Sequence, residues 1–364
     1  MRGKWARSAL LAGGLLLLPG CWDQQPIENR AVAIAAAVSR KDQWSFIFPN
    51  VAVTVNNLGQ IPPAQEFYTV TVRAHTWPEA MERLETQMSR QVSFGELQLL
   101  VVDRRLTHEA LTRIIDDMNT DGSIPATFWV AAADHPLAVL DLTSPQSIVP
   151  YYLLAQYFDC TTCHPWALGV HAWQWWADDG TPGDTPFLPL IEAQGATFVI
   201  DKLLLYPTPG VPVVAPPSIT EALAYLLGKV HAGVLSVTVN GMRFELDRME
   251  ASSRASARLA PDAVRVRVVL AVNGNIGDAP AHAVLSQQIE RAIDRAAART
   301  LHARLAQAVL WTNRHHADPY GYAKRAAWRD SEQAERLTPE TLGELPIEAT
   351  IRVRVRVQGE GVMR

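Results

Sequence analysis

The chain has 364 residues, of which 48% are hydrophobic and 19% are charged, and its formal net charge is −4 at pH 7. This composition is that of a folded protein, and the acidic balance argues against a general nucleic-acid-binding protein, which needs a basic face. Because one hydrophobic core rarely supports a chain of this length, we expect two or three domains.

The first twenty residues have the layout of an export signal. Three basic residues and no acidic ones accompany an apolar run over residues 9–18, which is typical of a secretory signal peptide. As a helix, this run would span only about 15 Å, half of a bilayer core of roughly 30 Å. We therefore do not expect it to remain as a membrane span.

Cys21 directly follows Leu18-Pro19-Gly20, and this stretch resembles a bacterial lipobox. In a lipobox the cysteine sulfur receives diacylglycerol, the chain is cut before the cysteine, and the new amino group is acylated. Two or more acyl chains anchor a protein stably where one binds only reversibly. We expect lipid attachment at Cys21, the alternative being an ordinary signal peptide with a coincidental cysteine. Since no later segment offers eighteen uninterrupted apolar residues, the body should lie outside the membrane as a tethered unit.

The first half of the exported chain predicts alternating strands and helices. Thr76 and Thr107 each precede a helical apolar pattern, and we predict them as N-caps, with Glu79 completing a capping box. Apolar and β-branched runs predict strands over residues 31–38, 67–72, 96–103 and 128–133, and two strands separated by a bend at Pro49-Asn50 over residues 44–55. This order predicts a mixed sheet with helices on at least one face.

The second half predicts a sheet crossed by a long helix. Asn240-Gly241 between two alternating apolar runs is the strongest short-range signal of a two-residue hairpin. Residues 264–268 and 351–357 also alternate as strands do. Between them, over residues 285–309, apolar residues recur at every fourth position and predict a helix of about seven turns packed along that sheet.

Together these patterns predict a multi-domain α+β fold with mixed or antiparallel sheets and helices packed on them. Residues 1–20 form the signal peptide, 21–190 an N-terminal α/β-type domain that could divide into two subdomains, and 191–364 a C-terminal α+β domain. In the last of these, an antiparallel sheet is crossed by the long helix. Ser218 is predicted to N-cap a helix that ends at Leu227.

Residues 160–164 read Cys-Thr-Thr-Cys-His, which fits the C-x-x-C-H pattern of c-type haem attachment. A single match of this length is weakly specific, and the surrounding sequence lacks the helical, methionine-containing setting of a cytochrome. Outside the cytoplasm the pair can form a disulfide or, with His171, part of a zinc site. We favour a disulfide or free thiols for Cys160 and Cys163, with a metal site at Cys160, Cys163 and His164, or haem, as alternatives, and we predict no bound cofactor.

Three other clusters have plain explanations beside a functional one. The tryptophans of residues 173–176 could stack on a sugar or a partner, or could pack under a loop. The adjacent histidines 315–316 point in different directions on a helix, so a polar helix end explains them better than a metal site. The alternating arginines of residues 352–356 could dock an acidic partner or anionic lipid, although a solvated strand face suffices.

Nothing in the sequence argues for catalysis. It contains no G-x-S-x-G, H-E-x-x-H, P-loop or G-x-G-x-x-G motif. No spaced pair of carboxylates stands out as a general acid and base. We predict that the protein is not an enzyme.

Several short motifs, taken in order, resemble the Ger(x)C lipoproteins, the C subunits of spore germinant receptors. Each motif alone is weak, but their order and spacing cover nearly the whole exported chain, and the lipobox precedes them. The motifs are Cys21-Trp22-Asp23, Ile27-Glu28-Asn29, Phe48-Pro49-Asn50, Gly95-Glu96-Leu97, Leu188-Pro189, Gly195-Ala196-Thr197-Phe198 and Ala317-Asp318-Pro319-Tyr320-Gly321-Tyr322. The chain departs from the family pattern in its proline-rich residues 206–217 and in its C-x-x-C-H element.

The resemblance implies a non-enzymatic subunit, lipid-anchored to the outer face of the inner spore membrane. It would act with a transporter-like B subunit and a multi-domain A subunit, both in the membrane, to trigger germination in response to nutrients. The residues do not show direct nutrient binding by this subunit. Two other functions stay open: an extracytoplasmic lipoprotein that binds a solute or glycan through the tryptophans, and a haem or metal redox lipoprotein that uses Cys160, Cys163 and His164.

Overall fold

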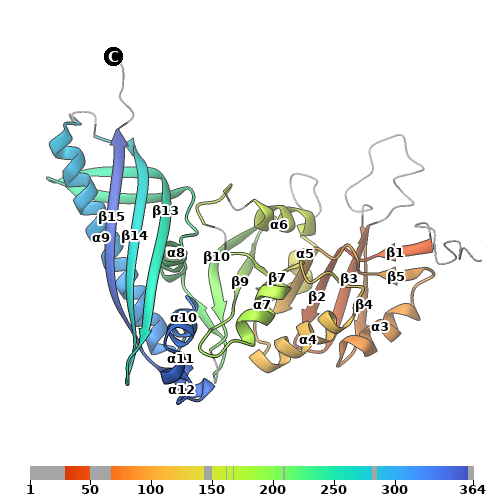
Figure 1. The fold of residues 1–364 in the computed structure, drawn as a ribbon. Coiled ribbons are helices and arrows are strands. Elements are labelled where there is room, and N and C mark those ends of the chain that lie inside the picture. Colours follow the sequence, from red (N-terminus) through yellow and green to blue (C-terminus); the bar gives the residue numbers. More distant parts are fainter. Residues whose placement is uncertain are drawn as a thin grey trace, which may run out of the picture.

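The computed structural model describes residues 29–49, 67–142, 150–160, 162–166, 168–207, 210–280 and 285–359. Within these ranges the chain forms two units that lie side by side in an elongated molecule (Figure 1). The first unit is a large sheet with helices on its faces, and the second is a four-stranded sheet crossed by one long helix. Cys21 lies outside the described residues.

The large sheet has nine strands in the order β11-β10-β9-β7-β6-β2-β3-β4, with β8 paired to β7. Strands β2, β6, β7 and β9 are parallel neighbours, and the remaining pairs are antiparallel. The strands are β2 (Ala35–Ser39), β3 (Gln43–Pro49), β4 (Phe67–Arg73), β6 (Leu99–Asp103), β7 (Trp129–Ala133), β8 (Val170–His171), β9 (Phe187–Gln194), β10 (Thr197–Leu205) and β11 (Val213–Ala215). The prediction of a mixed sheet is confirmed.

One predicted strand is divided in two. Residues 31–38 were expected to form one strand, but β1 (Arg30–Val32) pairs with β5 (Gln91–Ser93) while β2 joins the large sheet. Ala33 donates to Ser93 O, whereas Ile34 donates to Ile47 O. The chain changes hydrogen-bonding partner between these two residues, and a continuous apolar run carries no sign of such a change.

Helices cover both faces of the large sheet (Figure 1). The helices are α3 (Trp77–Glu85), α4 (His108–Thr120), α5 (Pro136–Leu140), α6 (Pro150–Asp159) and α7 (Ala172–Asp179). Thr76 and Thr107 accept hydrogen bonds from the backbone N–H of Glu79 and Ala110, which confirms both N-caps. The predicted capping box is wrong, because the Glu79 carboxylate accepts from the N–H of His75 and not from that of the N-cap residue Thr76.

The second unit is built on a sheet of β12 (Gly233–Val239), β13 (Met242–Leu259), β14 (Val264–Asp278) and β15 (Ile347–Gly359). The hairpin at Asn240 and Gly241 is confirmed, with φ angles of 52° and 77°, as a type I′ turn requires. The long helix is α9 (Gln287–Arg314). Its buried apolar residues are Ile293, Ala296, Ala297, Leu301, Leu305, Ala308 and Val309, which confirms the predicted stripe.

The fold class is confirmed, but one pairing in the second sheet differs from the expected antiparallel arrangement. Strand β15 pairs with β14 in parallel, from Val264 opposite Ile347 to Ile276 opposite Gly359. The cause is α9, which carries the chain back along the sheet before β15 begins. A crossover of this kind joins parallel strands, whereas a tight hairpin joins antiparallel ones.

The remaining helices are α8 (Pro217–Leu227), α10 (Tyr322–Arg329), α11 (Ser331–Ala334) and α12 (Pro339–Glu344). The predicted N-cap of α8 at Ser218 is wrong, because the N-cap is Pro216. Pro217 occupies the first helical position, where its fixed φ and missing N–H favour a helix start. The helix ends as predicted at Leu227, and Gly228 follows with a φ of 68°.

Strand β10 connects the cores of the two units. Leu203 and Leu205 pack into the core of the second unit, while Leu204 packs into the core of the first. Successive side chains of a strand point to opposite faces, so this one strand is buried on both sides. The domain boundary predicted near residue 190 lies inside β9, and the large sheet continues beyond it to Ala215.

Candidate functional site

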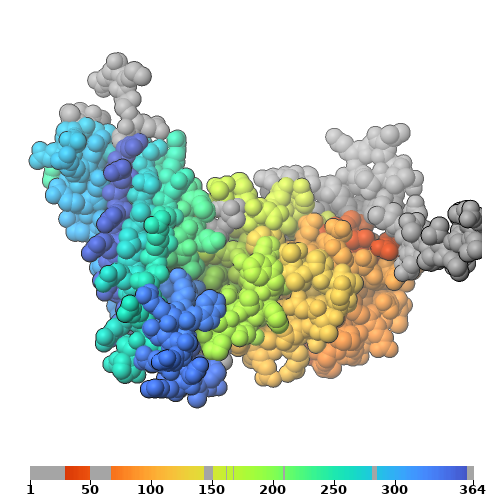
Figure 2. Space-filling view, in the orientation of Figure 1, coloured from red at the N-terminus to blue at the C-terminus, as the bar shows by residue number. Residues whose placement is uncertain are grey.

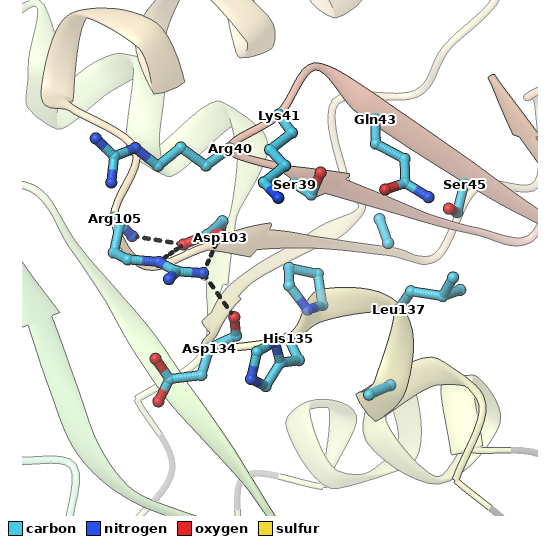
Figure 3. Close-up of a pocket in the computed structure, with 13 residues that line it drawn as sticks. Ser39, Arg40, Lys41, Gln43, Ser45, Asp103, Arg105, Asp134, His135 and Leu137 are labelled. Atoms are coloured by element: carbon cyan, nitrogen blue, oxygen red, sulfur yellow. Dashed lines mark hydrogen bonds and ion pairs between the residues drawn. The ribbon is translucent and has the colours of Figure 1, made fainter. Parts of the chain in front are cut away.

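The carboxyl ends of three parallel strands surround a cavity of about 550 Å³ with polar and apolar walls, which we call the strand-end pocket (Figure 3). Because β2, β6 and β7 are parallel neighbours, the residues that follow them meet at one edge of the sheet. Its lining residues are Ala37, Ser39, Arg40, Lys41, Gln43, Ser45, Asp103, Arg105, Asp134, His135, Pro136, Leu137 and Ala138.

A buried carboxylate organises this pocket. Asp103 accepts hydrogen bonds from three Arg105 groups: the backbone N–H at 2.9 Å, Nε at 2.8 Å and Nη2 at 2.7 Å. Burial alone would raise the pKa of Asp103, but the hydrogen bonds and charge of Arg105, with a backbone hydrogen bond from Arg40, lower it below its usual value. Asp103 therefore stays ionised and connects the ends of β2 and β6.

A second polar centre lies where the two units meet, and we call it the junction. Its members are Asp178, Asp184, Thr185, Asp318 and Lys324. The backbone N–H of Asp318 donates to Thr185 Oγ1 at 2.8 Å, and the N–H of Thr185 donates to the carbonyl of Asp318 at 3.1 Å. These two bonds join the start of β9 to the turn after α9. Figure 2 shows the blue segment of α10 to α12 against the yellow-green segment that contains α7.

The Asp318 side chain is fully buried at the start of α10. Its carboxylate accepts from the N–H of Tyr320 at 3.2 Å and of Ala323 at 2.7 Å. Burial raises the pKa of Asp318 to about 7, while the backbone N–H donors oppose the shift and the charge of Asp184 adds to it. Gly321 has a φ of 65°, and a Cβ there would lie 2.9 Å from Asp184 Oδ1, so the turn requires glycine.

Lys324 lies between the two other carboxylates of the junction. Its Nζ is hydrogen-bonded to Asp184 and is 3.6 Å from Asp178 Oδ1. Burial raises the pKa of Asp178 to about 6, with the charge of Asp184 adding to the rise and Lys324 opposing it. The junction is therefore a buried, charged contact between the units. Beside it lies an open cleft of about 840 Å³, which is also lined by Trp129, His171, Lys229, Tyr320, Arg325 and Trp328.

Comparison with known proteins agrees with this architecture. Residues 23–193 match the family described as "Spore germination protein N-terminal domain". This match, the relative and the solved structure described next together support a Ger(x)C-family protein. The chain is 22% identical over 159 residues to "Spore germination protein KC" of Bacillus subtilis (strain 168), an alignment that covers 40% of this chain and only 38% of that relative.

A solved structure shares the fold of this chain. The structure, titled "Crystal Structure of the GerBC protein", superposes with a TM-score of 0.53 at 10% sequence identity. The superposition covers 88% of this chain and 96% of that one. The similarity therefore extends through both units, well beyond the matched N-terminal family domain.

The candidate metal ligands of the C-x-x-C-H element do not converge on one site in the structure. Cys160 and Cys163 form a disulfide with a Cα–Cα distance of 5.4 Å. His164 stacks on Tyr157 with ring centroids 3.8 Å apart, and His171 stacks on Trp129 at 3.6 Å. Within the described ranges no group of three or more His, Cys, Asp or Glu side chains could hold a metal ion.

We expect the disulfide to contribute at the low end of the usual range for disulfides. It joins cysteines only three positions apart, and the chain-entropy relation gives about 2 kcal/mol for so short a loop. Replacing both Cys160 and Cys163 with Ser should lower the free energy of unfolding by about that amount or less, measured by urea unfolding under non-reducing conditions. A loss of more than about 4 kcal/mol would contradict this expectation.

The other predicted clusters are divided by the fold. Trp175 is buried and packs edge-on against Tyr206 at 4.9 Å, whereas Trp173 and Trp176 are 48% and 60% exposed. His315 packs on Trp311, and His316 has a φ of 48° in the turn that leads to Asp318. The arginines at 352, 354 and 356 are all exposed along β15. The three tryptophans therefore do not form one patch.

Neither polar centre was predicted from the sequence. The pocket had a weak signal, since charged residues directly follow β2, β6 and β7. These charged residues can be predicted to lie together only when β2, β6 and β7 are known to be parallel neighbours. For the junction, residues 317–322 were singled out by resemblance, but their partner Thr185 lies 133 positions away.

In the portion of the chain that the structure covers, no helix combines the length and the apolar character needed to cross a bilayer.

Proposed function

We propose that this protein is the lipid-anchored C subunit of a spore germinant receptor, held on the outer face of the membrane and acting without catalysis. The observation that carries the proposal is the family match over residues 23–193, which begins two positions after Cys21 of the lipobox. Acyl chains on Cys21 would place this germination domain at the membrane surface, although Cys21 itself lies outside the described residues.

The partners in this proposal are two integral membrane proteins, an A and a B subunit. Confinement to a membrane surface raises the effective concentration of a protein near integral partners without adding any contact. The proposal assigns nutrient recognition to the assembled receptor and leaves open whether this subunit contacts the nutrient.

The first test is the variant Cys21→Ala. We expect the wild-type protein to stay in the membrane fraction after a high-salt wash and to be released by detergent, whereas the variant should be found mostly in the supernatant. Nutrient-triggered germination should be reduced in spores that carry the variant. The matched control replaces Cys160 and Cys163 with Ser and keeps Cys21, so it should remain membrane-bound.

Retention of the Cys21→Ala variant in the washed membranes would show that lipid on this residue is not the main attachment. The partnership is tested separately by isolating the wild-type protein in mild detergent from dormant spores. Two integral membrane proteins should accompany it in constant ratio. Their absence would contradict the receptor role even if the lipid anchor were present.

A further inference from the structure

We propose that the strand-end pocket binds a small organic carboxylate that carries a compact apolar group. The proposal concerns this chain alone and does not depend on its role in a receptor. It rests on the position of the pocket in the sheet, on the charges that line it and on its apolar wall.

The pocket lies where the strand order of the sheet reverses. After β2 the chain builds β3 and β4 on one side, and then crosses to place β6 and β7 on the other side of β2. In open sheets with parallel strands, ligands bind outside the carboxyl ends of the strands at such a switch point. The strand-end pocket lies at this edge of the sheet.

The charges of the pocket favour an anion. Lys41 and Arg40 form no ion pair with any residue that the structure describes, whereas Asp134 is paired with Arg104 at 2.6 Å. Asp103 is paired with Arg105. Both carboxylates that line the pocket thus have partners, and two positive charges remain unpaired in a protein whose net charge is negative.

Arg105 is held in a fixed position with donors to spare. Its Nε and Nη2 groups bond to Asp103, and Nη2 also donates to the carbonyl of Asp134 at 3.2 Å. Among the described residues, its Nη1 has no acceptor. The two N–H groups of Nη1 are therefore left to donate to single oxygens of a bound anion, and the ion pair with Asp103 keeps this nitrogen in place.

The loop that carries the unpaired cations is held by the structure around it. Asp42 has a φ of 54°, its carbonyl accepts from the N–H of Ala74 at 2.8 Å, and its carboxylate lies 2.9 Å from Nδ1 of His75. Lys41 is therefore carried on a fixed turn. Figure 3 shows Lys41 and Gln43 on this hairpin, with Arg105 at the end of β6 and His135 and Leu137 at the start of α5, around one space.

The opposite wall accepts an apolar group of limited size. It is formed by Pro136, Leu137 and Ala138 at the start of α5, together with Ala37 of β2. A volume of about 550 Å³ lies within the roughly 300–1,000 Å³ of small-molecule pockets. The ligand that fits this combination has one carboxylate for the cations and a few carbon atoms for this wall.

The test uses four probes with the purified full-length protein in mild detergent: propionate, propionamide, n-propylammonium and inorganic phosphate. Binding is followed by isothermal titration calorimetry and by chemical-shift changes in NMR spectra. We expect propionate to bind with millimolar or tighter affinity. Propionamide and n-propylammonium should bind at least tenfold more weakly, because neither carries the negative charge.

A charge-matched pair of variants locates the site. The double variant is Arg40→Gln/Lys41→Gln, and because both side chains are exposed, it should still fold. We expect its Kd for propionate to rise at least tenfold, since one charge-assisted hydrogen bond contributes about that factor. The control Arg352→Gln/Arg354→Gln also removes two positive charges, but from the exposed side of β15. It should bind propionate as the wild type does. Equal thermal unfolding of all three proteins confirms that they are folded.

Four results would overturn the proposal. Absence of propionate binding would remove the site, and equal binding of propionamide would remove the role of charge. If phosphate bound with a lower Kd than propionate and displaced it, the pocket would be a general anion site. Unchanged affinity in the Arg40→Gln/Lys41→Gln variant would place the ligand elsewhere.

Discussion

Replacing Asp318 with Ala should lower the free energy of unfolding by about 3 kcal/mol at pH 5, the largest effect we expect from any polar residue of this protein. The substitution leaves the buried N–H groups of Tyr320 and Ala323 without their acceptor, and each unsatisfied buried donor costs about 1–3 kcal/mol. Ala323 lies in the first turn of α10, so the substitution also weakens the start of this helix. The measurement is urea unfolding, with Asp262→Ala in the exposed turn between β13 and β14 as the control.

The effect of this variant should depend on pH in a defined direction. Burial raises the pKa of Asp318 to about 7 in the folded protein, from 3.8 without the fold. The folded state therefore holds the proton more tightly, so the contribution of Asp318 to stability is complete below about pH 4 and is lost as the pH rises through 7. Asp178, with its pKa raised to about 6, acts in the same direction.

We therefore expect the difference in unfolding free energy between wild type and Asp318→Ala to be larger at pH 5 than at pH 8. The Asp262→Ala control should show no such trend. A difference that grew from pH 5 to pH 8 would mean that the backbone N–H groups dominate and that Asp318 is buried as a carboxylate. The same titration thus decides which protonation state connects the two units.

Local features of this fold could be predicted because their causes lie within a few residues. The N-caps at Thr76 and Thr107 need only a hydroxyl one turn before an apolar pattern. The hairpin at Asn240-Gly241 needs two adjacent residues that accept positive φ. The stripe of α9 is a period along one helix, and a helical period identifies a buried face without reference to what covers it.

Features set by distant residues could not be predicted in the same way. The parallel pairing of β15 depends on the path of α9 across the sheet, and alternation of apolar residues is the same for parallel and antiparallel edges. The double-sided burial of β10 depends on two different cores meeting at one strand. The bonds between Thr185 and Asp318 and the strand-end pocket likewise follow from the topology alone.

The second large effect is expected in α9, where two leucines allow a matched comparison. Leu305 is completely buried, whereas Leu310, five positions later on the same helix, is 57% exposed. Leu305→Ala should lower the free energy of unfolding by about 2–5 kcal/mol, because it removes buried methyl groups and leaves a cavity in a packed core. Leu310→Ala changes the same atoms and the same helix propensity, and should lower it by about 0.5 kcal/mol or less.

The comparison separates packing from helix formation. Helix α9 packs along the sheet of the second unit and against α8, and it also forms the crossover that places β15 beside β14. A cavity at Leu305 should therefore weaken the whole second unit, and hydrogen exchange should become faster in β14 and β15 as well as in α9. Equal destabilisation by Leu305→Ala and Leu310→Ala would contradict this account, because it would mean that helix propensity, and not burial against the sheet, determines the stability of this unit.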